Sequence, residues 1–223
     1  MQKDNPLYKN QGIHVICSIF TIDKGKTKVL LVKRKNEPYK DMWALVGGAL
    51  YNDETLEDGL KREIKEKTGI CDIKTVQSGI FSNPNRSPLM RMLAISFVGI
   101  LDFSKIEVLT DTLKTSDAQL FDIDDIPPLA YDHNEILRND IQTLKEKILN
   151  SDILESFYPN GFSLPELQVL YETILGVNID RRNFRKRLIE NNFILETGET
   201  QKFNGKKPAI IYKINKEKRG TLL

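Results

Sequence analysis

The stretch from Gly48 to Ile70 constrains the fold of this chain more than any other segment. Its fixed positions follow the pattern G-x5-E-x7-R-E-I-x-E-K-x-G-I, in which Glu54 precedes a dense run of charged residues. Apolar residues recur at helical spacing after Glu54, which predicts a helix over residues 55–68. Gly69 provides the glycine that commonly follows a helix end. We therefore expect a loop followed by a helix with charged side chains along one face.

Three charged positions of this helix indicate a possible site for a metal ion. Glu63, Glu66 and Lys67 are spaced i, i+3 and i+4, so we expect them on one side of the helix, facing solvent. Clustered carboxylates are suited to Mg²⁺, a hard cation that prefers oxygen ligands and often bridges to phosphates. A helix rich in glutamate and lysine, with an i, i+4 pair such as Glu63 and Lys67, is also typical of a solvated surface. Both interpretations are compatible with the helix alone.

The complete spacing resembles the Nudix box, G-x5-E-x7-R-E-U-x-E-E-x-G-U, where U is a bulky aliphatic residue. Every fixed position matches except the second glutamate of the E-E pair, which is Lys67. The resemblance implies an α/β fold, a Nudix α/β/α sandwich with a mixed sheet. It also implies that Glu63 and Glu66 bind metal, that Glu54 and Arg62 support the site, and that all four are catalytic only if hydrolysis is retained.

Lys67 removes one of the ligands that the resemblance implies. It also places a positive charge where the family holds another cation. We therefore expect Mg²⁺ binding to be possible but weakened, and hydrolysis to be weak or absent.

The composition favours a protein of the cytoplasm. No apolar run approaches the roughly 20 residues that span a bilayer, and the polar start lacks the apolar segment of a secretory signal. Cys17 and Cys71 are the only cysteines, and their spacing indicates neither a metal site nor a disulfide framework. We expect reduced thiols, a cytoplasmic location and no membrane partner.

Charge is distributed unevenly along the chain. Residues 1–150 carry 21 basic and 22 acidic side chains, whereas the part from Leu175 onward carries 12 basic and 5 acidic side chains. This bias makes the C-terminal part the candidate for binding an anionic partner. The polar run Asn150-Ser151-Asp152 predicts a boundary between one domain at 1–150 and another at 151–223.

The first domain is predicted to contain mainly strands and the second mainly helices. Strands are expected at 14–20, 28–33, 75–81, 92–101 and 119–122, and a helix over about 132–149. In the second domain, Ser163 and Asp180 are expected to begin two helices, and Gly176 to end the first. Strands at 193–196 and 208–214 are expected to form a hairpin with a basic tip.

Two helices followed by a basic hairpin predict a winged helix-turn-helix, whose second helix enters the DNA major groove while the wing touches phosphates. The side chains expected to contact DNA are Arg181, Arg182, Asn183, Arg185, Lys186 and Arg187 in the helix, and Lys206 and Lys207 in the wing. A basic helix is also compatible with a merely solvated surface, and a winged helix can bind proteins. The density of cations in this segment favours nucleic acid, and DNA over RNA.

The whole chain resembles the NrtR-type Nudix-related transcriptional regulators. The resemblance rests on the box, on Leu129-Ala130-Tyr131-Asp132-His133, and on Asp180-Arg181-Arg182-Asn183-Phe184-Arg185-Lys186-Arg187. It implies a homodimer that binds double-stranded operator DNA, with a Nudix-like domain that senses a small-molecule effector. The effector would be ADP-ribose or a similar nucleotide sugar, or a pentose.

Ligand contacts are predicted at Arg86, Arg91 and His133. Arg86 and Arg91 lie where ADP-ribose-handling relatives commonly have an R-D-P-R-like loop, although Ser87 stands in place of the aspartate. Arg86 is a candidate for pairing with a phosphate. His133 is either a ligand contact or a histidine satisfied at the start of its helix.

Two functions therefore remain open from the sequence. One is a ligand-responsive transcriptional regulator, and the other is a Mg²⁺-dependent Nudix hydrolase of compounds such as ADP-ribose. The sequence decides neither the effector, nor the operator sequence, nor whether regulation is activation or repression.

Overall fold

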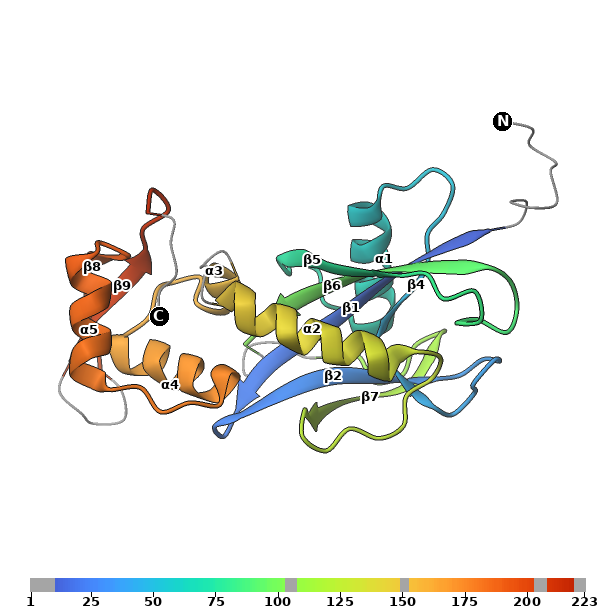
Figure 1. Cartoon of the computed structure of the whole chain (residues 1–223), viewed down its shortest axis with the longest axis horizontal. Helices are drawn as coiled ribbons and strands as arrows, with labels where there is room; N and C mark the ends of the chain where they lie inside the picture. Colours follow the sequence, from blue (N-terminus) through green and yellow to red (C-terminus); the bar gives the residue numbers. More distant parts are fainter. Residues whose placement is uncertain (1–10, 103–107, 149–152, 203–207, 219–223) are drawn as a thin grey trace.

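A mixed sheet of seven strands forms the centre of the N-terminal part (Figure 1). The computed structural model describes residues 11–102, 108–148, 153–202 and 208–218. The strand order is β3-β2-β1-β6-β5, with β4 also paired to β1 and β7 to β2. The strands are β1 (Gly12–Asp23), β2 (Lys26–Arg34), β3 (Trp43–Ala44), β4 (Val46–Ala49), β5 (Thr75–Phe81), β6 (Met92–Ile100) and β7 (Thr115–Asp122). Only β1 and β6 run parallel among these pairs, so the sheet is mixed.

Alternating side chains of β1 divide the core into two layers. Ile16 and Phe20 belong to one apolar cluster, which also contains residues of helix α2 (His133–Ile148). Val15 and Ile19 belong to the other cluster, together with residues of helix α1 (Leu56–Thr68). Successive side chains of a strand point to opposite faces, so each helix covers one face. The predicted α/β/α sandwich with a mixed sheet is confirmed.

Helix α1 begins and ends as its sequence predicts, but two of the three charged residues on its predicted solvent-facing side are buried, whereas Glu66 is exposed. The Thr55 side chain caps the first turn, and Gly69 adopts the left-handed φ of 77° that ends the helix. Glu63 is only 2% exposed and Lys67 only 9%. The expected solvent-facing position of these two residues is therefore wrong. Glycines of β4 lie against this face, and a Cβ atom at Gly48 would collide with the Glu63 carboxyl group.

The C-terminal part is a winged helix-turn-helix. It contains α3 (Leu154–Phe157), α4 (Leu164–Leu175), α5 (Arg181–Glu190) and the hairpin of β8 (Ile194–Gln201) and β9 (Ala209–Ile214). Ser163 and Glu166 form a capping box before α4, and Asp180 caps α5. The predicted helices and hairpin are present, whereas the short helix α3 was not predicted. The basic tip at 203–207 and the predicted boundary at 150–152 lie outside the described residues.

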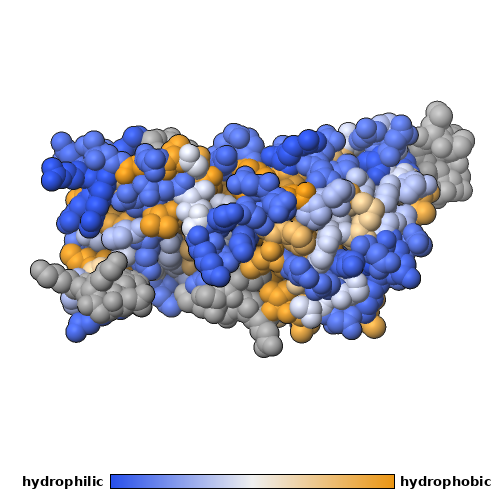
Figure 2. All heavy atoms as spheres, turned by 90° about the horizontal axis from the view of Figure 1, so that it is seen from below, coloured by the Kyte–Doolittle hydropathy of each residue, from blue (hydrophilic) through white to orange (hydrophobic). Residues whose placement is uncertain are grey.

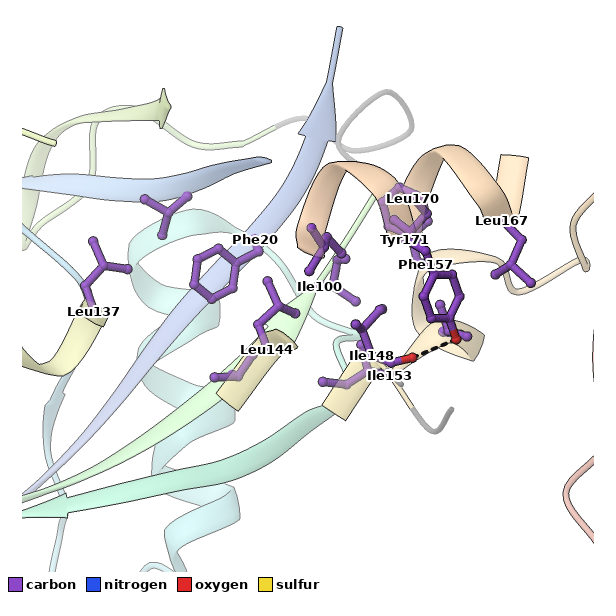
Figure 3. Packing of buried hydrophobic residues seen from close by; sticks show 14 of the residues in the cluster. Phe20, Ile100, Leu137, Leu144, Ile148, Ile153, Phe157, Leu167, Leu170 and Tyr171 are labelled. Atoms are coloured by element: carbon purple, nitrogen blue, oxygen red, sulfur yellow. Dashed lines mark hydrogen bonds between the residues drawn. The ribbon is translucent and has the colours of Figure 1, made fainter. Parts of the chain in front are cut away.

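Both parts of the chain contribute to one apolar cluster. Phe20, Ile100 and Ile148 from the sandwich belong to the same cluster as Leu170 and Tyr171 from α4 (Figure 3). The Tyr171 hydroxyl donates a hydrogen bond of 2.8 Å to the carbonyl oxygen of Ile148, at the end of α2. The winged helix is thus packed firmly against the end of α2 and the adjoining sheet.

The face of the molecule seen in Figure 2 is mostly hydrophilic, with apolar residues exposed in scattered patches. Among the helices of the described residues, none is long and apolar enough to cross a membrane.

Candidate functional site

A cavity of about 190 Å³ is lined by strands of the sheet, by Lys67 of α1 and by residues at the start of α2. Gly47 and Gly48 of β4 form part of its wall. Its charged and aromatic lining comes from His14, Arg34, Lys67, Lys114, Tyr131 and His133. These six residues come from β1, β2, α1, the segment before β7, and the start of α2, so only the fold brings them together.

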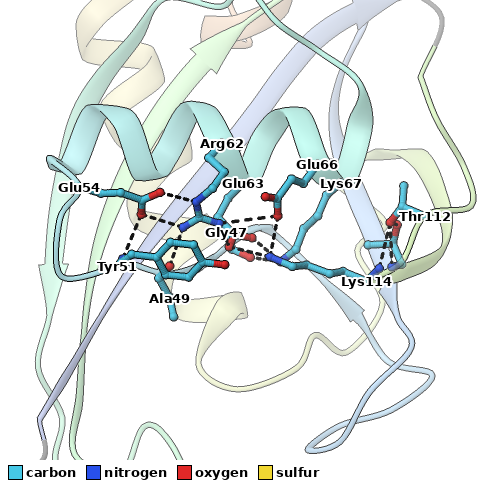
Figure 4. Close-up of polar contacts among 11 residues, drawn as sticks. Gly47, Ala49, Tyr51, Glu54, Arg62, Glu63, Glu66, Lys67, Thr112 and Lys114 are labelled. Carbon is cyan, nitrogen blue, oxygen red and sulfur yellow. Dashed lines mark hydrogen bonds and ion pairs between the residues drawn. The ribbon is translucent and has the colours of Figure 1, made fainter.

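Arg62 organises the acidic residues of the box (Figure 4). Its guanidinium makes two hydrogen bonds to Glu54, one of them 2.8 Å long, and a third of 2.6 Å to Glu63. It also lies 3.8 Å from the ring centroid of Tyr51. The hydrogen bonds from Arg62 lower the pKa of Glu54 to about 2. The structure thus joins the four residues expected to support catalysis, because Glu66 also lies 3.7 Å from Arg62.

Glu63 lies at the centre of three positive charges. Lys114 Nζ is 3.0 Å from one carboxylate oxygen and Lys67 Nζ is 3.3 Å from the other, while Arg62 completes the set. Burial alone raises the pKa of Glu63, but the adjacent charges of Lys67, Arg62 and Lys114 outweigh this effect and lower the pKa. Burial lowers the pKa of Lys67, against the opposing influence of Glu63. Lys67 also donates a hydrogen bond to the carbonyl oxygen of Gly47.

The residues present do not fit a divalent metal ion well. Glu63 and Glu66 are the expected ligands, and both are paired with Lys114, at 3.0 and 2.7 Å. Lys67 occupies the position of the third carboxylate. Within the described ranges, no group of three or more histidine, cysteine, aspartate or glutamate residues is arranged to hold a metal. The carboxylates are therefore already neutralised by the protein's own cations.

Aromatic side chains form another part of the cavity lining. Tyr131 contacts Tyr39 edge to face at 4.6 Å and stacks on His133 at 5.5 Å, while Arg34 lies 5.0 Å from the Tyr131 ring centroid. His133 Nδ1 accepts a hydrogen bond of 3.1 Å from the backbone N–H of Leu45. Burial lowers the pKa of His133 well below its usual value, so its imidazole is neutral near pH 7. His133 is thus satisfied by Leu45 and also faces the cavity.

The other two predicted ligand residues have partners outside the cavity lining. Arg86 is buried and makes two hydrogen bonds of 2.8 Å to Asp132, which immediately precedes α2. Arg91 donates a hydrogen bond of 2.7 Å to the Ser82 carbonyl oxygen. Arg86 therefore anchors the start of α2 beside the cavity. A direct ligand contact by either arginine stays a prediction.

Sequence reasoning did not identify four residues that line this cavity: His14, Arg34, Lys114 and Tyr131. Lys114 precedes β7 in a segment without a motif, and only the pairing of β7 with β2 brings it to the box. His14 and Arg34 occupy ordinary positions in strands. Tyr131 belongs to the junction segment Leu129–His133, and its positive φ of 55° marks an unusual backbone conformation.

We predict that the half-buried His14 of β1 makes the stability of the protein depend on pH. Burial and the charges of Arg86 and Lys67 lower the pKa of His14 to about 4. Between about pH 6.5 and about pH 4 the unfolded chain binds a proton at this residue while the folded chain does not. The free energy of unfolding should therefore fall as the pH is lowered through this window, with His14 contributing on the order of 2 kcal/mol.

Urea unfolding of the wild type and of His14→Gln across this pH range tests this prediction. The variant should lose part of the pH dependence, while His133 is unchanged in both proteins. Parallel dependence on pH in the two proteins would show that His14 titrates normally in the folded state.

Helix α5 presents a basic surface on the winged helix. Phe184 and Leu188 are buried, whereas all of the helix residues predicted to contact DNA are exposed. Those exposed residues are Arg181, Arg182, Asn183, Arg185, Lys186 and Arg187. At 100° per residue, Arg182 and Lys186 point away from the buried pair. The wing residues Lys206 and Lys207 lie outside the described residues.

Comparison with known proteins agrees with this architecture. The family model described as NUDIX domain matches residues 12–140, and the one described as NrtR DNA-binding winged helix domain matches residues 156–214. The chain is 32% identical over 212 residues to the ADPR responsive transcriptional repressor NtrR of Acinetobacter baylyi, covering 92% of this chain and 83% of that protein.

Two solved structures show the same folds. Shewanella oneidensis NrtR complexed with a 27mer DNA has a TM-score of 0.78 and 27% identity, covering 91% of this chain and 93% of that chain. The NUDIX domain of Shewanella oneidensis NrtR complexed with ADP ribose has a TM-score of 0.58 and 26% identity, covering 64% of this chain and 94% of that chain. The chain belongs to the NUDIX family, among those members in which the NUDIX domain is followed by an NrtR-type DNA-binding winged helix domain.

Proposed function

We propose that this protein is a ligand-responsive transcriptional regulator. The part up to residue 150 senses a small molecule, and the part from residue 151 binds double-stranded operator DNA. The observation that carries this proposal is the exposed basic face of α5, held in a winged helix by buried Phe184 and Leu188. Such a helix has the charge and the position to enter a major groove.

The effector that best suits the cavity is ADP-ribose or a similar nucleotide sugar. Arg34, Lys67 and Lys114 supply positive charge for phosphates, and the Tyr131 ring supplies a surface for an apolar ring. A pentose has no charge to complement these cations, so it suits the cavity less well. The ADP-ribose complex of the related NUDIX domain and the ADPR responsive relative support this choice.

Helix α2 provides a physical connection between effector and DNA. Its first residue, His133, lines the cavity, and its last residue, Ile148, accepts the hydrogen bond from Tyr171 of α4. A ligand that binds one position of α2 better than another therefore changes the preferred position of the winged helix. By linkage, the same ligand changes operator affinity.

We further propose that the protein acts as a cytoplasmic homodimer on a palindromic operator. Two recognition helices related by a two-fold axis match two half-sites of DNA. Sedimentation analysis with and without operator DNA tests this, since two chains should bind one full operator. One chain per operator would contradict it.

The alternative function is a Mg²⁺-dependent hydrolase of nucleoside diphosphate-linked compounds. NUDIX domains in general use a divalent cation, and Glu54, Arg62, Glu63 and Glu66 remain together here. Against hydrolysis, Lys67 and Lys114 neutralise the carboxylates that would bind the ion. We propose weakened Mg²⁺ binding, with little or no turnover.

A paired experiment separates the two functions. Binding to the DNA upstream of the protein's own operon is measured with no ligand, with ADP-ribose and with arabinose, while release of AMP from ADP-ribose is assayed with Mg²⁺. We expect salt-sensitive DNA binding that changes with ADP-ribose, and little AMP. Rapid AMP release without DNA binding at moderate salt would establish the hydrolase instead.

A further inference from the structure

Two lysines from distant parts of the chain converge on the box carboxylates. Lys67 comes from α1, and Lys114 comes from the segment before β7. Figure 4 shows both side chains directed toward the acidic residues of the box. Lys67 Nζ is 3.3 Å from Glu63, and Lys114 Nζ is 3.0 Å from Glu63 and 2.7 Å from Glu66.

The charges of this cluster balance before any ligand binds. Glu54, Glu63 and Glu66 contribute three negative charges, and Arg62, Lys67 and Lys114 contribute three positive charges. A carboxylate site attracts a divalent cation through its excess negative charge. Here that excess is cancelled by ammonium and guanidinium groups that belong to the protein. The cluster therefore has no excess negative charge with which to attract an additional cation.

Both ammonium groups retain the capacity to bind an anion. An ammonium group has three N–H donors. Lys67 directs one donor toward Gly47 and one toward Glu63. Lys114 directs one donor toward Glu63 and one toward Glu66. Among the described contacts, each ammonium group therefore keeps one N–H donor for a ligand. Both side chains line the cavity, where Arg34 adds another positive charge.

We propose that Lys67 and Lys114 together take the place of the divalent cation of the box, so that this pocket binds a diphosphate without metal. The inference rests on the proposed sensing function and specifies how the same site recognises its ligand. It also explains why the box keeps Glu63 and Glu66. Their carboxylates hold the two ammonium groups at the cavity wall, where a metal would otherwise have to be recruited from solution.

Calorimetric titration of the full-length protein tests the proposal. ADP-ribose and inorganic pyrophosphate are each titrated into the wild type, Lys67→Met and Lys114→Met, in excess EDTA and again in Mg²⁺. The wild type should bind with the same affinity in both conditions. Each methionine variant removes one charged donor and should weaken binding about tenfold or more. Methionine keeps an unbranched side chain at the buried position 67 and at the partly exposed position 114, and thermal unfolding verifies that each variant is folded.

Lys65→Met is the matched control, because Lys65 lies on the same helix but is exposed. It should bind like the wild type. Lys67→Glu should make binding depend on Mg²⁺, since it restores a carboxylate and removes a cation. A wild type that binds only with Mg²⁺, or folded Lys67→Met and Lys114→Met variants with unchanged affinity, would overturn the inference.

The same titrations distinguish failure of ADP-ribose as the effector from failure of the two-lysine site. Metal-independent binding of pyrophosphate without binding of ADP-ribose would support the two-lysine site and refute ADP-ribose as effector. Binding of neither compound in either condition would overturn the two-lysine site, whereas binding of operator DNA is measured independently.

Discussion

Replacing both Arg182 and Lys186 of α5 with glutamate is expected to lower operator affinity about a hundredfold or more. The two side chains are exposed and lie one helical turn apart, on the side of α5 opposite Phe184 and Leu188. Each lost phosphate contact removes favourable charge neutralisation and counterion release, and each new carboxylate is repelled by the DNA backbone. The two effects act in the same direction at both positions.

The measurement is a binding titration with operator DNA at several salt concentrations. The variant should also show a shallower dependence of affinity on salt, because fewer phosphates are neutralised. Arg138→Glu is the matched control, since Arg138 is an exposed arginine on α2, outside the winged helix. ADP-ribose binding should be unchanged in both variants. Full operator affinity in the double variant would exclude α5 as the DNA-binding element.

Replacing Tyr171 with alanine is expected to reduce the free energy of unfolding by roughly 3–5 kcal/mol. Tyr171 is fully buried, packs edge to face on Phe184 with ring centroids 5.7 Å apart, and donates its hydroxyl proton to Ile148. Alanine removes the ring from the apolar cluster that both parts of the chain share. It also leaves the Ile148 carbonyl oxygen without this donor.

Chemical unfolding followed by tryptophan fluorescence and by circular dichroism measures this effect. Trp43 is the only tryptophan and lies in the sandwich, whereas circular dichroism also reports the helices of the winged part. Both signals should shift together in Tyr171→Ala, and Tyr171→Phe should lose only about 1–2 kcal/mol. Val169→Ala is the control, because Val169 is half exposed on the same helix. A shift of the circular dichroism transition alone would show that the two parts unfold independently.

The helices were the most predictable part of the fold, because their starts and ends depend on local chemistry. Three helices begin at a capping side chain, which is Thr55 for α1, Ser163 for α4 and Asp180 for α5. Two of these helices end at a glycine, α1 at Gly69 and α4 at Gly176. These signals act over three or four residues and need no distant partner. The short strands β3 and β4 and helix α3 carry no comparable signal, since they exist through contacts with the rest of the fold.

The prediction that Glu63 and Lys67 face solvent was wrong because burial depends on contacts that are distant along the chain. The spacing of Glu63 and Lys67 places them on one face of α1, and that relation holds in the structure. Spacing alone does not say what lies against the face. Here the glycines of β4, which have no side chains, approach closely enough to bury both residues.

The Nudix-like sandwich could be predicted from the resemblance of residues 48–70 to the Nudix box. The winged helix and the basic character of α5 could be predicted from capping residues and local charge, because these signals act between residues that are close along the chain. Only the tertiary structure decided the composition of the cavity. Lys114 lies far from Glu63 along the chain, and the pairing of β7 with β2 brings the two together. Tertiary packing also decided that α2 extends from the cavity to Tyr171. Electrostatic and packing energies depend on distance in space, and separation along the sequence does not specify that distance.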